Sequence, residues 1–153
     1  MKSTITIVVL LLCLAIPVVV AAENPKVDWV RGTDFSRFHT FTWAKAVYAI
    51  QDPDANLGMA RAVQEELEAK SVQFITSDQK FDVFVTYNAK INQDSQDLSK
   101  SQISINVRIF DSKDDSVVWS AGGYVALGND KTQNRSNVRG LLAEMFKKYP
   151  PTE

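Results

Sequence analysis

The strongest hydrophobic pattern in the chain lies between Ser101 and Val125, where apolar and polar residues alternate on both sides of an acidic segment. The alternating apolar positions are Ile103, Ile105, Val107 and Ile109, then Val117, Trp119, Ala121, Gly123 and Val125. A period of two returns strand side chains to the same face of a sheet. Because the intervening segment Asp111–Asp115 is short and polar, the pattern predicts the central hairpin of an antiparallel sheet.

Three further segments have the composition of strands. Phe81–Ala89 alternates in the same way, whereas Lys26–Arg31 and Thr40–Ala44 are shorter. Four aromatic residues gather around the third segment: Phe35, Phe38, Phe41 and Trp43. Aromatic side chains bury a large area each, so we expect them to fix a loop into the core. Gly122-Gly123 predicts a bulge or a place where another backbone comes close.

Two amphipathic helices complete the pattern. Asp52-Pro53 has the residues of a helix start, and apolar residues then recur at helical spacing as far as Phe74, which predicts a helix over about 53–72. The last helix is indicated by one apolar stripe: Val138, Leu141, Leu142, Met145, Phe146 and Tyr149. Lys147 and Lys148 suit its C-terminal end, and Pro150-Pro151 stops it.

The predicted order is strand, strand, helix, strand, strand, strand, helix. Each long strand has one strongly apolar face and one mixed face, as in an antiparallel sheet that is covered on one side. We therefore predict the α+β class: a two-layer sandwich in which two helices cover one face of an antiparallel sheet of about five strands. With 153 residues, the chain is long enough for one such domain.

The first 22 residues have the pattern of a secretory signal peptide. Lys2 precedes an apolar run from Ile5 to Val20, and Ala21-Ala22 ends it with small residues. We expect cleavage after Ala22, an exported domain over 23–153 and no stable membrane span afterwards; retention of the segment as an anchor is the alternative. Cys13, the sole cysteine, lies inside the apolar run rather than at its end, where a lipoprotein carries its lipid.

Composition and motifs give no sign of chemistry. The formal charge of −1 offers no electrostatic reason for nucleic acid binding. His39, with Asp34 and Ser36, supplies the residue types of a hydrolytic triad, but triads join residues that are distant in sequence. The acidic clusters Asp52/Asp54, Asp94/Asp97 and Asp111/Asp114/Asp115 lack the spacing of a calcium loop and suit turns and helix caps. We predict no enzyme activity, no metal and no cofactor.

The mixed face of the long strands is the one candidate site. Alternation places six residues on it: Phe84, Thr86, Arg108, Phe110, Val118 and Tyr124. A contiguous apolar patch on an uncovered face marks a contact surface. The bland alternative is that loops over 92–100 and 127–135 fold across it.

Several short motifs resemble a known family. They are Val27-Asp28, Asp34-Phe35-Ser36, Phe38-x-Thr40-Phe41-x-Trp43, Leu67 with Lys70-Ser71, Asp82-Val83-Phe84-Val85-x-Tyr87, Asp111, Val118-Trp119 and Tyr149-Pro150-Pro151. Together they make the mature chain similar to the bacterial domain of unknown function 4136 family. The resemblance implies an α+β cell-envelope protein and no known activity.

The chain departs from this family pattern at three places. Ser71 stands where Gly is usual, Phe81 stands where Pro is usual, and Ser120-Ala121-Gly122 replaces an Arg-Gly step after the Trp. Many members look like lipoproteins, whereas the lipid-bearing Cys is absent here.

The first hypothesis is a non-enzymatic envelope module, periplasmic or envelope-associated in a bacterium, that contacts a protein or envelope component through its exposed sheet face. The alternative is a small-ligand binder with a pocket between the sheet and the aromatic residues Trp29, Phe35, Phe38, Phe41 and Trp43. An envelope hydrolase is the third.

Overall fold

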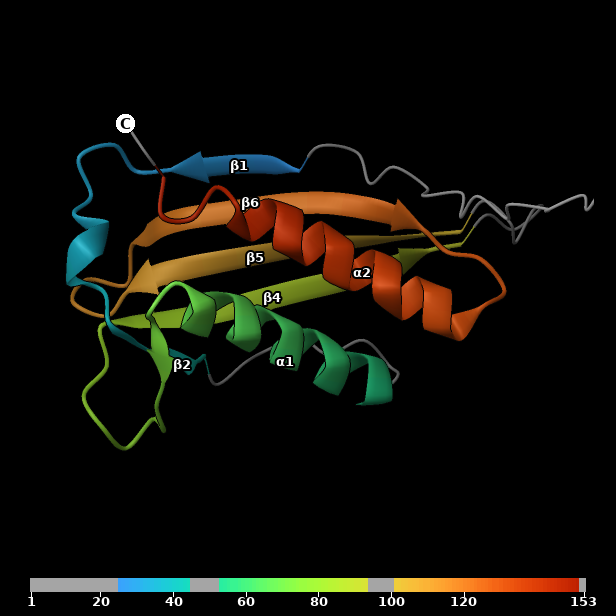
Figure 1. The fold of residues 1–153 in the computed structure, drawn as a ribbon. Helices are drawn as coiled ribbons and strands as arrows, with labels where there is room; N and C mark the ends of the chain where they lie inside the picture. The colour runs from blue at the N-terminus through green and yellow to red at the C-terminus, as the bar shows by residue number, and fades with distance from the viewer. Residues whose placement is uncertain (1–24, 45–52, 94–100, 152–153) are drawn as a thin grey trace, which may run out of the picture.

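A computed structural model describes residues 25–44, 53–93 and 101–151. Figure 1 shows a long sheet with two helices packed against one of its faces. In these residues the strands are β1 (Lys26–Trp29), β2 (Thr40–Trp43), β3 (Gln73–Phe74), β4 (Val83–Asn92), β5 (Gln102–Asp111) and β6 (Val117–Ala126). The helices are α1 (Pro53–Ala69), α2 (Lys131–Phe146) and the 3₁₀ turn η1 (Phe35–Arg37). The predicted helix starting cap Asp52 lies outside the described residues.

The predicted α+β sandwich is confirmed, with a sheet that is mixed rather than wholly antiparallel. The strand order is β1-β6-β5-β4-β2-β3. The pairs from β1 to β4 are antiparallel, whereas β2 runs parallel to both β4 and β3. Helix α1 connects β2 to β3 and β4, and a helical crossover returns the chain to the same end of the sheet. Strands joined in this way are parallel.

The predicted hairpin is present as β5 and β6, which are neighbours in the sheet and pair from Gln102↔Ala126 to Phe110↔Val117. Strand β4 pairs with the other edge of β5 through ten consecutive residue pairs, from Val83↔Asp111 to Asn92↔Gln102. The apolar positions of β4 and β5 are buried beneath the helices: Val83, Val85, Tyr87, Ile103, Ile105, Val107 and Ile109. The predicted stripe of α2 packs on them through Leu141, Leu142, Met145 and Phe146, all 0% exposed. One-sided burial therefore holds both layers together.

Gly123 lets α2 approach the sheet closely. A Cβ at this position would lie 2.8 Å from Leu141 Cδ1 and 3.4 Å from Met145 Cε. On the opposite face, a Cβ at Gly122 would lie 2.5 Å from Asn106 Oδ1. Side chains, rather than the predicted backbone, thus make the closest approaches to the two glycines. The bulge of β6 lies elsewhere, beside the Ile109/Phe110 register shift.

Helix α1 ends three residues before the predicted end at Val72. Ser71 N–H donates to Glu68 O (3.0 Å), and Val72 N–H donates to Leu67 O (3.0 Å). This pair of bonds is a Schellman motif, which requires a left-handed residue after the cap. Ser71 takes that place with φ 65°. The chain then leaves the helix, so Phe74, predicted on the helical stripe, lies in β3 instead.

The aromatic segment is plugged into the core as predicted. Phe38 and Phe41 are 3% and 0% exposed. The Phe35 ring packs edge-on against both Phe38 and Tyr149, with centroid distances of 5.9 and 5.7 Å. Trp43 packs in the same way against Phe41. Phe38 and Phe41, two of the aromatic residues that the small-ligand hypothesis placed around a pocket, are thus part of the core.

Replacing Gly123 should weaken the packing between the sheet and α2. We expect Gly123→Val to lower the free energy of unfolding by about 1–3 kcal/mol, because its side chain needs space that Leu141 occupies. Gly140→Ala is the matched control, since Gly140 lies in exposed helix with nothing within 4 Å of its missing Cβ. That change should stabilise by about 1 kcal/mol. Urea unfolding measures both, and wild-type stability of Gly123→Val would contradict the packing described.

Ser71→Gly should raise the free energy of unfolding by roughly 0.5–1 kcal/mol, because glycine adopts a positive φ without the steric cost that Ser71 bears. Ser71→Val should lower it, since a branched side chain tolerates this conformation poorly. Thermal melts of the two variants give the comparison. Equal melting temperatures would show that the helix end does not depend on the left-handed residue.

Candidate binding groove on the open face of the sheet

The face of the sheet opposite the helices carries the polar half of the strand alternation. Register aligns its side chains in rows across the strands. One row runs Asp28, Ser120, Arg108 and Thr86, from β1 through β6 and β5 to β4. The next runs Lys26, Gly122, Asn106 and Asn88. Arg108 and Asn106 are exposed, so this central part of the face is open to solvent.

The structure brings together most of the predicted contact residues. Phe84 and Phe110 pair across β4 and β5, and their rings stack at 4.7 Å with an interplanar angle of 6°. Thr86 and Arg108 form the next pair along the same strands. Tyr124 is 37% exposed and lies further along the face, opposite Ser104. The stacked rings are half-buried, so the exposed part of the face is more polar than predicted.

The prediction that Val118 lies on the open face is wrong. Val118 is 4% exposed, whereas alternation placed it on the open surface. The register explains the difference: Ile109 pairs with Trp119, but Phe110 pairs with Val117, which leaves Val118 as the extra residue of a bulge. Its carbonyl accepts a hydrogen bond from Val30 N–H at 3.0 Å. Val117, not Val118, is exposed here, at 37%.

A groove of about 480 Å³ lies on this face, over β1, β6 and β5. We name it the open-face groove. Its outward-pointing lining residues are Lys26, Asp28, Ser104, Asn106, Arg108, Ser120, Gly122 and Tyr124. Gly122 contributes no side chain to the floor, and Asn106 Oδ1 lies 2.5 Å from the position that a Cβ of residue 122 would take. The size falls within the range of small-molecule sites, roughly 300–1,000 Å³.

The charges of the open-face groove are not matched in pairs. Its lining holds two cations, Lys26 and Arg108, and one carboxylate, Asp28. Asp28 Oδ1 accepts from the neighbouring Trp29 N–H at 2.9 Å. Within the described residues, the Arg108 guanidinium has no ion pair, whereas Arg61 and Arg139 both pair with Glu65. Arg108 is also exposed, so its charge faces solvent in the described part of the chain.

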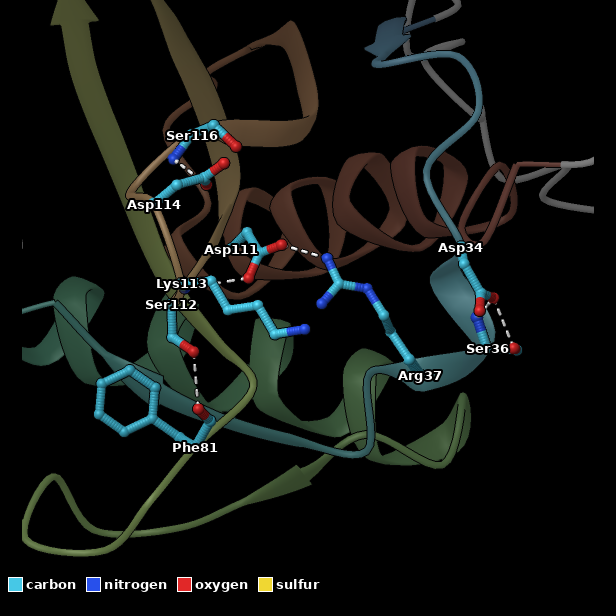
Figure 2. A network of polar contacts seen from close by, with 9 residues as sticks. All are labelled: Asp34, Ser36, Arg37, Phe81, Asp111, Ser112, Lys113, Asp114 and Ser116. Carbon is cyan, nitrogen blue, oxygen red and sulfur yellow. Dashed lines mark hydrogen bonds and ion pairs between the residues drawn. The ribbon is translucent and has the colours of Figure 1, made fainter.

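A second group of polar residues lies at one end of the sheet, and we name it the polar network (Figure 2). Arg37 of η1 pairs with Asp111, whose side chain is 7% exposed, and its guanidinium also lies 4.5 Å from the Phe38 ring centroid. Asp111 additionally accepts from Lys113 N–H (3.0 Å), and Ser112 Oγ donates to Phe81 O (2.8 Å). These contacts fasten η1 and the entry to β4 onto the β5–β6 turn, which is a structural use.

Asp82 locks β2 against the start of β4. Its Oδ2 accepts from His39 N–H, Thr40 N–H and Thr40 Oγ at 3.0, 3.0 and 2.9 Å. Burial acts to raise the pKa of Asp82, but the hydrogen bonds to the charged form outweigh it and hold the pKa below its usual value. The carboxylate therefore stabilises the fold in its ionised state.

The residue types of a triad are used locally. Asp34 caps η1, and hydrogen bonds from the Ser36 hydroxyl (2.5 Å) and backbone N–H (3.0 Å) lower the pKa of its carboxyl. His39 is exposed, and its backbone N–H serves Asp82. Among the described residues, no three His, Cys, Asp or Glu side chains gather as metal ligands. Asp114 accepts from Ser116 N–H (3.0 Å), as its turn position predicted; Asp52/Asp54 and Asp94/Asp97 lie outside the side chains described.

The family model described as Domain of unknown function (DUF4136) matches residues 25–151. The chain belongs to the DUF4136 family. No curated protein sequence matches it. A solved DUF4136 protein from Bacteroides thetaiotaomicron shares the fold, with 14% identity, a TM-score of 0.62 and coverage of 82% of this chain and 95% of that one.

Two other solved structures have the same fold. A PDZ domain protein from Parabacteroides distasonis gives a TM-score of 0.67 at 16% identity. The match covers 85% of this chain but 36% of that protein, so this DUF4136 chain spans about a third of its length. Lipoprotein GNA1162 from Neisseria meningitidis gives a TM-score of 0.50 at 11% identity over 71% and 98% of the two chains.

The described part of the DUF4136 chain contains no helix that is long and apolar enough to span a bilayer. The predicted signal segment, residues 1–22, lies outside that part.

We expect Asp82→Asn to lower the free energy of unfolding by about 1–2 kcal/mol at pH 7, because a neutral amide accepts the three hydrogen bonds less strongly. The pKa of Asp82 is depressed by folding, so the wild-type contribution is present above pH ~4 and is lost as pH falls through the folded pKa. Urea unfolding at pH 7 and pH 3 measures the free energy of unfolding of both proteins. The difference between Asp82→Asn and the wild type should be smaller at pH 3 than at pH 7.

Asp28→Asn is the control, because an exposed aspartate whose contact is to its neighbour should change the stability by less than about 0.5 kcal/mol. A gap for Asp82→Asn that stays constant with pH would show that the ionised carboxylate is not what joins the strands.

Proposed function

We propose that this DUF4136 domain is an exported, non-enzymatic binding module of the bacterial envelope, which holds an envelope component on the sheet face away from its helices. One observation carries the proposal: both helices pack on one face of the sheet, and the opposite face presents the open-face groove and exposed charged side chains. Folding alone requires neither a groove on this face nor an exposed Arg108 that has no ion pair among the described residues, so both features support a binding role.

The envelope location is supported by two features outside the fold itself. The pattern of residues 1–22 is that of a secretory signal peptide. One of the solved proteins with this fold is named a lipoprotein. The present chain has its sole cysteine within the apolar run, so the proposal places the domain in the periplasm without a lipid of its own.

The non-enzymatic part of the proposal follows from how the reactive residue types are used. A hydrolase needs a nucleophile beside a base. The sole histidine, His39, is exposed on the segment before β2, and Asp34 and Ser36 bond to each other as the cap of η1. The lining of the open-face groove offers hydroxyl, amide and charged groups, which suit recognition rather than bond cleavage.

Charge placed on the open face should abolish binding without unfolding the domain. We expect Thr86→Glu and Phe110→Glu proteins to lose the component that the wild type retains from a solubilised envelope fraction. Thr86 is half-buried on the open face, and Phe110 stacks on Phe84 there. Affinity capture followed by mass spectrometry measures retention, and thermal melting checks the fold; Thr86→Glu remains informative where Phe110→Glu melts early.

Lys131→Glu is the matched control, because Lys131 is exposed on α2, on the other side of the sheet. The control should retain the same component as the wild type. Retention by Thr86→Glu, or loss by Lys131→Glu, would contradict a binding role for the open face.

A further inference from the structure

We propose that the open-face groove binds a small acidic compound, with a phosphate or carboxylate group seated between Arg108 and Lys26. This inference rests on the proposed function and specifies the chemistry that the open face recognises. It is carried by the position of the two cations, by the Arg108 guanidinium, which has no ion pair in the part of the chain that the structure describes, and by the neutral polar groups around them.

The register sets the distance between the two cations. Lys26 lies on β1 and Arg108 on β5, with β6 between them. Neighbouring strands are ~4.8 Å apart, and Arg108 lies one row further along the sheet than Lys26, a step of two residues or ~7 Å, so the two Cα positions are about 12 Å apart. Ser120 and Gly122 of β6 line the space between them. That separation admits one anionic group between the two flexible cationic side chains, with the Asn106 amide beside it over Gly122.

The charge balance favours an anion. Two cations and one carboxylate give the lining a formal charge of +1, whereas the whole chain carries −1. Asp28 shares a row with Arg108 but stands two strands away, and it accepts a hydrogen bond from Trp29 N–H. It therefore leaves Arg108 unneutralised. An arginine fork matches the oxygens of a phosphate or carboxylate, with two parallel hydrogen bonds.

The other side chains that line the groove indicate which neutral groups the compound carries. Asn106 offers an amide and Ser120 a hydroxyl, both on the same side as Arg108. A cavity of about 480 Å³ suits a compact molecule whose hydroxyl or amide groups exchange hydrogen bonds with these side chains. A small polar acid fits this description, whether it is free in solution or forms the headgroup of an anionic lipid.

The soluble source is tested with glycerol 3-phosphate as the probe, by calorimetric titration of the purified protein and by amide chemical shifts of Ser120 and Gly122. We expect saturable binding with a dissociation constant of ~1 mM or lower and shifts at both amides. Arg108→Gln should weaken binding about tenfold or more, and Lys26→Gln about fivefold.

One substitution should act in the opposite direction. Asp28→Asn removes the single carboxylate of the lining and should tighten binding about twofold. Arg108→Lys, which keeps the charge and loses the fork, should fall between wild type and Arg108→Gln. Arg135→Gln, the same charge change on exposed α2, should leave the affinity unchanged.

The lipid source is tested by sedimentation with vesicles of phosphatidylglycerol against vesicles of phosphatidylcholine. Binding to the anionic vesicles alone, lost in Arg108→Gln and competed by glycerol 3-phosphate, would assign the site to a headgroup; binding of the soluble probe alone would assign it to a free acid. Either result supports the proposal.

Three results would overturn the proposal: absence of binding to both probes, binding that Arg108→Gln does not change, or self-association of the wild type that Arg108→Gln abolishes, which would make a second copy the occupant. Where both probes fail but Thr86→Glu still loses its captured envelope component, the acidic ligand is wrong and the proposed function stands. Where that capture also proves insensitive to the open face, both fail.

Discussion

The structure depends on the burial of one face of a twisted sheet beneath two helices. Strands β4, β5 and β6 place their apolar side chains on a single face, and the stripe of α2 covers that face without exposing Leu141, Leu142, Met145 or Phe146. Close approach at Gly123 makes the contact possible, because any side chain there would meet Leu141. Burial of this kind is the main favourable term in folding, and here it uses only half of the sheet.

The unused half is where function becomes possible. Strand alternation directs the side chains between the buried positions away from the helices. Residues at these positions therefore do not need to fit the packing of the core. Pairing in register then aligns Asp28, Ser120 and Arg108 in one row and Lys26, Gly122 and Asn106 in the next. Ion pairs fasten the connecting segments, as Arg37 does with Asp111, while Arg108 is left without one among the described residues. Under the proposed function, the same sheet carries the residues that stabilise the fold on one face and those that bind a partner on the other.

Local periodicity predicted both helices and five of the six described strands, because a period of two or 3.6 can be recognised in consecutive residues. The features that it did not predict depend on contacts between residues that are distant in the sequence. Strand β3 has two residues and exists through its pairing with β2, while its Phe74 continues the helical stripe of α1. Arg37 and Asp111 are 74 residues apart.

The candidate site was predictable to the same extent. Alternation identified Arg108 and Tyr124 as outward-facing, but Val118 was misplaced because a bulge interrupts the period of two. Lys26 and Asp28 were missed as groove residues, since only the register between β1 and β6 brings them beside Ser120 and Gly122.

The most direct test of one-sided burial is cysteine accessibility at Asn106 and Val107, adjacent residues on opposite faces, in a chain whose sole native cysteine, Cys13, is replaced by Ser. We expect rapid thiol modification of Asn106→Cys in the folded protein and protection of Val107→Cys until the protein unfolds. Equal protection of both cysteines would show that the face opposite the helices is covered.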